Sequence, residues 1–279
     1  FGLTEESVKA HERAFGDIVI SCGASTEASN IILSGENSAR SAFIQKPQCG
    51  TGCFTVVLAP GHDRLSHRGN ALRISGALSG SLTGNAAVPA RDLKLSRMGL
   101  LIGGSSRHSQ WGAQDLKAVL EGVKGLSQAR EMEVFLTTSR RTDPGCEKTL
   151  EDALGAWPQC SRRLIVSREN PPGAYDGILS DADFLVVTAD SISMISEAVS
   201  TGKPVVVVWP AGKPGGSNKL TRFIDEMARE GGFVAARPDE LEQAIGAVGN
   251  HQRGSDSSGS NDRVLKETAR RLLSGDKRS

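Results

Sequence analysis

Short apolar runs alternate along the chain with amphipathic segments and small-residue turns. The runs Phe184–Val187 and Val205–Val208 show no alternation of apolar and polar positions, which is typical of strands buried on both faces. Between them, Ile192, Ile195 and Val199 recur at helical spacing and form one apolar stripe. This stretch therefore predicts a strand, helix and strand of a parallel sheet.

The same order of elements continues on both sides of this stretch, with a polar or small-residue turn after most predicted strands. Further strands are predicted at 17–21, 42–45, 54–59, 98–102, 134–137 and 163–166. Helices are predicted at 4–14, 26–33, 146–157, 175–180, 218–229, 238–248 and 263–273, and another begins at about Gly112. Only three strands fit before residue 75, and open sheets of this kind usually have more. The pattern predicts an α/β protein with parallel sheets whose amino-terminal domain is incomplete.

Two stretches without periodicity divide the chain. Residues 78–95 are rich in Ser, Gly, Asn and Pro, and residues 250–262 are rich in Ser and Gly, so both are predicted linkers. The expected organisation is an amino-terminal domain at 1–95, a carboxyl-terminal domain at 96–250, and a flexible linker with a closing helix at 251–279.

Composition narrows the function classes. Among 279 residues the net charge is +1, which gives no argument for nucleic acid or a charged membrane surface. No apolar run approaches the ~20 residues of a membrane-spanning helix. Five irregularly spaced cysteines favour reduced thiols in a cytoplasmic compartment, and Cys49 and Cys53 lack a second pair that would suggest zinc.

Ligands of open parallel sheets bind outside the carboxyl ends of the strands. In the second domain four segments are expected to meet at that edge: 103–109, 138–143, 188–193 and 210–218. Their residues offer close backbone approach, hydroxyls and cationic donors, a set that suits a diphosphate attached to neutral polar groups. The candidate binding residues are Gly103, Gly104, Ser105, Ser106, Ser139, Arg140, Arg141, Thr188, Asp190, Ser191, Ser193, Glu197, Asn218 and Lys219, and Lys213 could add positive charge.

The predicted helix after residue 190 is central to this hypothesis. Its start presents backbone N–H groups to an anion, and Asp190 stands where an N-cap belongs. Ser193 and Glu197 share a helix face, from which the carboxylate can hold ribose hydroxyls. Alternatively, Asp190 simply caps the helix, Glu197 is an ordinary solvated residue, and Arg140 and Arg141 are a solvated pair.

Common nucleotide-binding and hydrolase motifs are absent from the sequence. It contains no GxGxxG fingerprint and no GxSxG elbow. Gly103-Gly104 is not followed by the Lys-Ser/Thr of a P-loop, which argues against ATP or GTP hydrolysis.

In the first domain, His62 and Asp63 follow a predicted buried strand and are expected at its carboxyl edge. A histidine there can act as general base because its pKa lies near neutrality. A structural role is an equal alternative, with Asp63 capping the turn and His62 packed in the interior.

These segments together resemble a known family. The residues that carry the likeness are Pro60-x-His62-Asp63, Gly76-Ala77, Gly103-Gly104-Ser105, the run 138–142 (TSRRT) and above all 188–204, with Asp190, Glu197 and Gly202-Lys203-Pro204. They resemble the mitochondrial fission "elongated mitochondria" family of bacteria and plants over most of residues 16–232. The carboxyl half is more distantly similar to GT-B glycosyltransferases, including the lipid-intermediate N-acetylglucosaminyltransferase of peptidoglycan synthesis.

The resemblance implies two Rossmann-like domains facing a cleft, the second binding a UDP- or GDP-linked sugar and the first an acceptor. Glu197 would match the ribose-binding glutamate, Gly104, Ser105, Asp190, Ser191 and Ser193 the phosphate-binding turns, and His62 an acceptor-side position. The closing helix would cross back to the first domain. No cofactor or metal is expected.

Two classes of function remain open. The first is an enzyme, a glycosyltransferase or a sugar-nucleotide epimerase, with His62 or Asp63 as base. The second is a non-catalytic adaptor, since plant members are linked to mitochondrial division through a dynamin-like GTPase, at the cytoplasmic face of a membrane. Convergent polar residues in the second domain favour nucleotide-sugar binding.

Overall fold

The computed structural model describes residues 14–65, 69–78, 95–104, 111–209, 218–249 and 257–274, together with Glu6 and Lys9. The chain divides into two compact units, here called unit 1 (Phe1–Ser75 with Asp256–Ser279) and unit 2 (Gly76–Ser255). The expected boundary near residue 95 therefore differs from the observed division. Most of the predicted linker at 78–95 and most of the predicted helix at 4–14 lie outside the described residues.

Unit 1 is built on a four-stranded parallel sheet in the order β1-β2-β3-β4. Its elements are β1 (Ile18–Cys22), η1 (Ala24–Thr26), α2 (Glu27–Glu36), β2 (Arg40–Ile44), η2 (Thr51–Cys53), β3 (Val56–Pro60), η3 (Gly61–Asp63), β4 (Ala71–Ile74) and α9 (Ser257–Leu273). The sequence pattern missed β4 because its four residues ALRI include an exposed arginine, which interrupts the apolar run. The prediction of only three strands before residue 75 was wrong.

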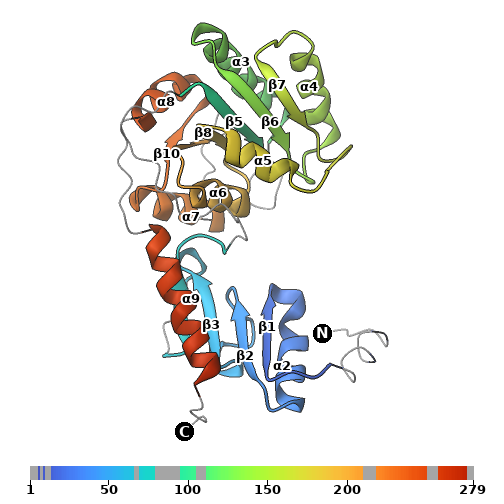
Figure 1. Cartoon of the computed structure of the whole chain (residues 1–279), viewed down its shortest axis with the longest axis vertical. Helices are drawn as coiled ribbons and strands as arrows, with labels where there is room; N and C mark the ends of the chain where they lie inside the picture. Colours follow the sequence, from blue (N-terminus) through green and yellow to red (C-terminus); the bar gives the residue numbers. More distant parts are fainter. Residues whose placement is uncertain are drawn as a thin grey trace. The chain divides into compact units, whose positions relative to one another are not determined.

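The closing helix α9 belongs to unit 1, as the family resemblance implied. It begins at Ser257, six residues before the predicted start, and lies along β2, β3 and β4 (Figure 1). Leu272 packs against Ala42 and Val56, and the Arg40 guanidinium donates to the Leu272 carbonyl at 2.9 Å. Helix α2 covers the other face, where Ile31 packs against Phe43 and Val57. The sheet of unit 1 is thus covered by elements from both ends of the chain.

Unit 2 contains a six-stranded parallel sheet in the order β10-β9-β8-β5-β6-β7. Its strands are β5 (Arg97–Ile102), β6 (Glu133–Thr138), β7 (Cys160–Leu164), β8 (Phe184–Thr188), β9 (Val205–Val208) and β10 (Val234–Ala236). Its helices are α3 (Ala113–Ala129), α4 (Pro144–Leu154), α5 (Ala174–Asp181), α6 (Ile192–Ser200), α7 (Lys219–Arg229), η4 (Pro238–Glu240) and α8 (Leu241–Gly249). Strand β10 is too short for its pattern to stand out, and β7 begins at Cys160 rather than at the predicted Arg163.

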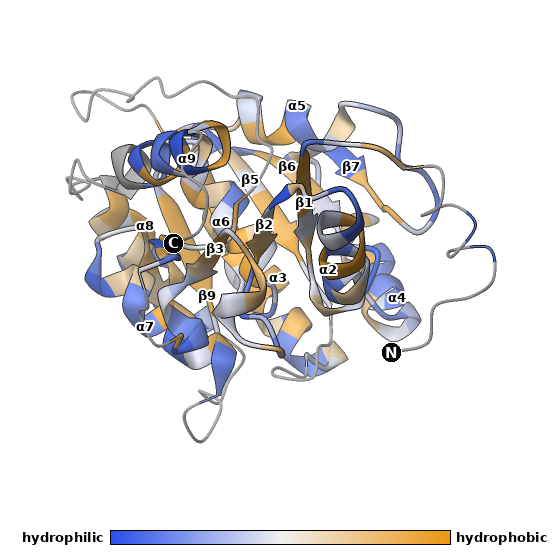
Figure 2. Cartoon of the chain, turned by 90° about the horizontal axis from the view of Figure 1, so that it is seen from below, coloured by the Kyte–Doolittle hydropathy of each residue, from blue (hydrophilic) through white to orange (hydrophobic). Residues whose placement is uncertain are grey.

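Alternate side chains of the unit 2 strands enter two hydrophobic cores. Leu100 and Val186 point to the face covered by α3, α4 and α8, whereas Leu101 and Val187 point to the face covered by α5, α6 and α7. Figure 2 shows the strands as largely hydrophobic, while α4 and α7 carry hydrophilic stretches. Burial on both faces explains why these strands read as unbroken apolar runs, and it holds the strand ends in fixed register.

Candidate functional site

The strand order of unit 2 reverses between β5 and β8. From β5 the chain adds β6 and β7 on one side, and then returns to β8, β9 and β10 on the other. In open parallel sheets the crevice outside such a reversal is where ligands bind. The turns after β5 and β8 flank this point, and they contain Gly103, Gly104, Ala189, Asp190 and Ser191.

A buried carboxylate joins these two turns. The Asp190 side chain is 4% exposed, and its Oδ2 accepts the Gly104 backbone N–H at 2.8 Å. The Thr188 hydroxyl donates to Asp190 Oδ1 at 2.5 Å and itself accepts the Gly103 N–H at 2.8 Å. Hydrogen bonds within the protein therefore hold these two turns together at the sheet edge.

Both glycines are needed for this close approach. A Cβ at Gly103 would lie 1.8 Å from Asp190 Oδ2, and one at Gly104 would lie 1.9 Å from the Arg141 carbonyl oxygen. From the sequence, the two glycines are expected to allow close approach of a ligand. In the structure the space is taken by the protein's own Asp190 and Arg141, and both N–H groups already have acceptors.

Burial raises the pKa of Asp190 to about 6 from an ordinary value near 3.8. The hydrogen bonds from Thr188 and Gly104 and the charge of Arg141 act in the opposite direction, because they favour the ionised form. Desolvation is the larger effect. Burial thus disfavours the ionised form of this carboxylate, which lies at the point where the strand order reverses.

The loop after β6 joins the same network. The Thr142 hydroxyl donates to the Gly103 carbonyl at 2.7 Å, and the Ser139 N–H donates to that hydroxyl at 3.0 Å. The Arg141 guanidinium donates to Ser191 Oγ at 3.2 Å, so it reaches the start of α6. Three of the four loops that the sequence predicts at this sheet edge are thereby connected, and the fourth, at 210–218, lies outside the described residues except for Asn218.

The start of α6 corrects one prediction. Ser191, not Asp190, is the N-cap, and its hydroxyl oxygen accepts the Met194 N–H at 3.4 Å. Asp190 is instead directed to β5, as its bond with Gly104 shows. The first-turn N–H groups of Ile192 and Ser193 have no acceptor within the helix, and Ser193 is exposed. An anion can therefore approach α6 beside Arg141.

Other predicted residues lie less centrally. Arg140 is exposed, and its side chain has no hydrogen bond or ion pair with a described residue. Asn218 caps α7, since its Oδ1 accepts the Thr221 N–H at 2.9 Å, and Lys219 begins that helix. Ser105, Ser106 and Lys213 lie outside the described residues.

Glu197 stands one turn into α6 and is half-buried. Its Oε2 accepts the Tyr175 hydroxyl at 2.8 Å. Burial, with the Glu197 charge, raises the pKa of Tyr175 above its ordinary value near 10, which keeps the phenol protonated as a donor. The sequence argument identified Glu197 but not Tyr175, which stands 22 residues earlier on a different helix.

Two further motif residues have structural roles that the sequence did not disclose. The Ser196 hydroxyl accepts the Ala77 N–H at 2.9 Å, and Gly76, with φ 67°, lies against Ser196. The Lys203 ammonium donates to the carbonyls of Leu179 (2.7 Å), Ser180 and Ala182 (2.5 Å), so it caps the end of α5. The Gly-Lys-Pro motif thus anchors the helix that carries Tyr175.

In unit 1, His62 follows β3 directly, as predicted. It lies in η3 and is buried, and its Nε2 is 3.8 Å from Asp63 Oδ1. That distance is longer than a hydrogen bond but short enough for attraction if the imidazole is protonated. The assignment of His62 or Asp63 as base stays a prediction.

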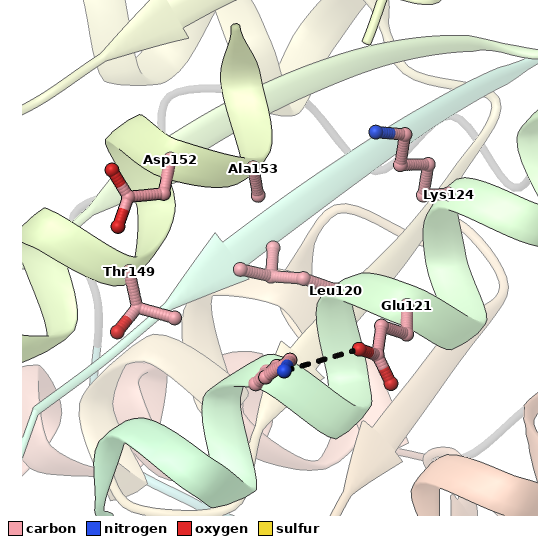
Figure 3. A pocket seen from close by; sticks show the side chains of 7 residues that line it. Leu120, Glu121, Lys124, Thr149, Asp152 and Ala153 are labelled. Atoms are coloured by element: carbon pink, nitrogen blue, oxygen red, sulfur yellow. Dashed lines mark ion pairs between the residues drawn. The ribbon is translucent and has the colours of Figure 1, made fainter. Parts of the chain in front are cut away.

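A hollow of about 410 Å³ lies elsewhere in unit 2, between α3 and α4 (Figure 3). Leu120 and Ala153 form its apolar floor, and Lys117 pairs with Glu121 at 3.8 Å on its rim. Its lining comes from helix sides and includes no residue of the turns after β5, β6 or β8. It is therefore separate from the candidate site.

The described residues contain no group of three or more His, Cys, Asp or Glu side chains arranged to hold a metal ion. None of their helices combines the length and the apolar character that a membrane span requires.

Comparison with solved structures defines the fold. The fold is similar to a putative UDP-N-acetylglucosamine 2-epimerase from Listeria monocytogenes (TM-score 0.61, 13% identity, 97% of this chain and 78% of that chain). It is also similar to the Methanocaldococcus jannaschii UDP-GlcNAc 2-epimerase in complex with UDP-GlcNAc and UDP (TM-score 0.55, 14% identity, 95% of this chain and 78% of that chain). A third similar structure is the glycotransferase of kitacinnamycin (TM-score 0.50, 13% identity, 96% of this chain and 76% of that chain). This protein therefore has an α/β fold of the GT-B type with two Rossmann-like parallel sheets.

The sequence profile described as "Mitochondrial fission ELM1" matches residues 3–268, so the chain belongs to that family. One curated relative is the Arabidopsis thaliana mitochondrial fission protein ELM1, with 41% identity over 75 residues. The matched stretch makes up 27% of this chain and 17% of the plant protein, well under two thirds of that protein's length.

Proposed function

We propose that unit 2 binds a nucleotide-diphospho-sugar at the carboxyl edge of its sheet. The diphosphate lies at the start of α6, where first-turn N–H groups without an acceptor inside the helix, the helix dipole and the Arg141 guanidinium favour negative charge. The pentose lies against Glu197, whose carboxylate accepts its hydroxyl groups. A UDP- or GDP-linked sugar is the expected ligand.

The observation that carries this proposal is the network across the strand reversal. Asp190, Gly104 and Thr188 hold the turns after β5 and β8 together, and Thr142 adds the turn after β6. A buried carboxylate with a raised pKa costs stability, and such groups concentrate at functional sites. Complexes with UDP-GlcNAc and UDP in a protein of similar fold add support.

We further propose that the protein is a glycosyltransferase that needs no metal ion. Sugar transfer from a nucleotide requires stabilisation of the leaving diphosphate, which Arg141 and the α6 start can provide, and a base for the acceptor hydroxyl. His62 is the candidate base, since it is the histidine that follows a buried strand of unit 1.

A sugar-nucleotide epimerase is a second candidate, because two of the similar structures carry that activity in their names. An epimerase converts its sugar nucleotide without an acceptor, whereas a transferase releases little product until an acceptor is added. Proton NMR of the sugar nucleotide, incubated with the protein alone, separates the two.

A non-catalytic adaptor is a third candidate, favoured by membership of the mitochondrial fission family. A dynamin-like GTPase at a membrane would then be the partner, and the protein would not need a working nucleotide-sugar site. Ligand binding by the isolated protein therefore discriminates this candidate from the first two.

The test is the thermal stability of the protein with UDP-, GDP-, ADP- and CMP-linked sugars. A ligand at a hundred times its dissociation constant stabilises the folded state by about 2.7 kcal/mol. Glu197→Ala should remove most of the ligand-induced shift and lower the unliganded Tm only slightly, since Tyr175 loses one acceptor. Glu121→Ala, an exposed glutamate on α3, is the matched control and should keep the shift. No shift with any nucleotide sugar contradicts the proposal.

A further inference from the structure

Tyr175 is the only tyrosine of the chain, and it stands at the start of α5. It packs at the edge of the core between the sheet and α5, α6 and α7. From there its hydroxyl donates to Glu197 Oε2 at 2.8 Å. Among the described residues it is the only side chain that donates to the Glu197 carboxylate.

The position of Tyr175 is set from both ends of its helix. Ile178 and Leu179 are buried against the sheet, and the Lys203 ammonium caps the last carbonyls of α5. Gly173, with φ 79°, allows the turn that begins the helix. A phenol has few rotatable bonds, so a helix fixed in this way fixes the hydroxyl.

The two carboxylate oxygens of Glu197 have different surroundings. Oε2 is held by Tyr175, and no described residue donates to Oε1. A half-buried glutamate without such a contact would sample several rotamers, and ordering them on binding costs free energy. With the contact, one oxygen is oriented in advance and the other is left to accept hydroxyl hydrogens.

We propose that Tyr175 is a positioning residue that orients Glu197 to distinguish ribose from deoxyribose in the nucleotide ligand. This inference rests on the proposed binding of a nucleotide-diphospho-sugar. Tyr175 acts through Glu197 and does not itself contact the reacting atoms. Its loss therefore weakens the pentose contact selectively.

The first experiment measures the dissociation constants of UDP and 2′-deoxy-UDP by calorimetry. The wild-type protein should bind UDP about tenfold more tightly, which corresponds to about 1.4 kcal/mol. Tyr175→Phe should lose most of that preference, with weaker UDP binding and nearly unchanged 2′-deoxy-UDP binding. Ser180→Ala removes a hydroxyl from the far end of the same helix and should retain the preference.

The outcomes separate the two proposals. If the wild-type protein binds UDP with a preference for ribose and Tyr175→Phe keeps that preference, the role of Tyr175 is overturned while nucleotide binding stands. If the wild-type protein binds neither compound, and no other nucleotide sugar shifts its Tm, both proposals are overturned.

A second measurement covers the case in which Tyr175→Phe folds poorly. Protein labelled with 3-fluorotyrosine gives one fluorine resonance, because the chain has one tyrosine. UDP should shift this resonance more than 2′-deoxy-UDP does, and Glu197→Gln should abolish the difference. A resonance that responds equally to both compounds in the wild-type protein overturns the inference.

Discussion

The carboxylate of Asp190 accepts the backbone N–H of Gly104 across the point where the strand order of unit 2 reverses. This single contact joins the turns after two adjacent strands that are 82 residues apart in sequence, from Ile102 to Phe184. The acceptor for the Gly104 N–H is thus a buried side-chain carboxylate, and burial raises the pKa of that carboxylate to about 6.

The raised pKa of Asp190 predicts how stability depends on pH. Between about pH 4 and pH 6 the folded state holds a proton that the unfolded state releases, so the contribution of Asp190 falls as pH rises through this window. The rise in the pKa of Asp190 corresponds to a change in the free energy of unfolding of at most about 3 kcal/mol across this window. Asp190→Asn removes the titration, and its amide oxygen can still accept the Gly104 N–H.

Urea unfolding of both proteins from pH 4 to pH 7.5 checks this expectation. The free energy of unfolding of the wild-type protein should fall relative to that of Asp190→Asn as pH rises. A difference between the two proteins that is constant over this range, or that changes in the opposite direction, contradicts the assignment.

Replacing Gly104 should lower the stability of the protein, because its turn is tightly packed. A Cβ there would meet the Arg141 carbonyl at 1.9 Å, so Gly104→Ala must displace a loop and is expected to cost about 1–3 kcal/mol. Gly125→Ala is the matched control, because nothing lies within 4 Å of its Cβ position in α3. The control should be neutral or stabilising by up to about 1 kcal/mol. Equal Tm values for the two variants would refute the packing argument.

The two neighbouring arginines should differ in their effect on ligand binding. Arg141 reaches the cap of α6, whereas Arg140 is exposed and its side chain contacts no described polar group. Arg141→Ala should weaken UDP binding about tenfold or more, because charge-assisted bonds to phosphate are strong. Arg140→Ala should change it less than twofold at 0.15 M salt. Calorimetric titration of both variants decides, and the reverse order would place the diphosphate elsewhere.

Lys203 is expected to be a stability residue. Its ammonium bonds to three carbonyls at the end of α5, so Lys203→Met should lower the free energy of unfolding by about 2 kcal/mol. Lys117→Met, on an exposed face of α3, removes a weak surface pair and should cost less than about 0.5 kcal/mol. Similar losses from both variants, measured by urea unfolding, would show that the cap contributes little.

Much of the fold of unit 2 could be predicted because its strands are buried on both faces. The apolar runs at β5, β6, β8 and β9 are continuous, and the helices between them have clear stripes. Two short strands were missed, because an exposed arginine interrupts the apolar run of β4 and because β10 has only three residues. The turns after β5, β6 and β8 could also be predicted to meet at one edge, because parallel strands bring their carboxyl ends together.

The roles within the candidate site were harder to predict. The sequence pattern predicts Asp190 as the N-cap of α6, but Ser191 is the N-cap. Asp190 instead accepts the Gly104 N–H in the turn after β5. The two arrangements differ by one residue of register, which propensity does not resolve. Tyr175 and Lys203 contact partners more than 20 residues away on other elements, so no local spacing discloses them.

A crystal structure of the protein with a UDP-linked sugar tests the central claim most directly. We expect the diphosphate at the start of α6 within hydrogen-bond distance of Arg141, and a pentose hydroxyl donating to Glu197. A nucleotide bound elsewhere, or a pentose that makes no contact with Glu197, would contradict it.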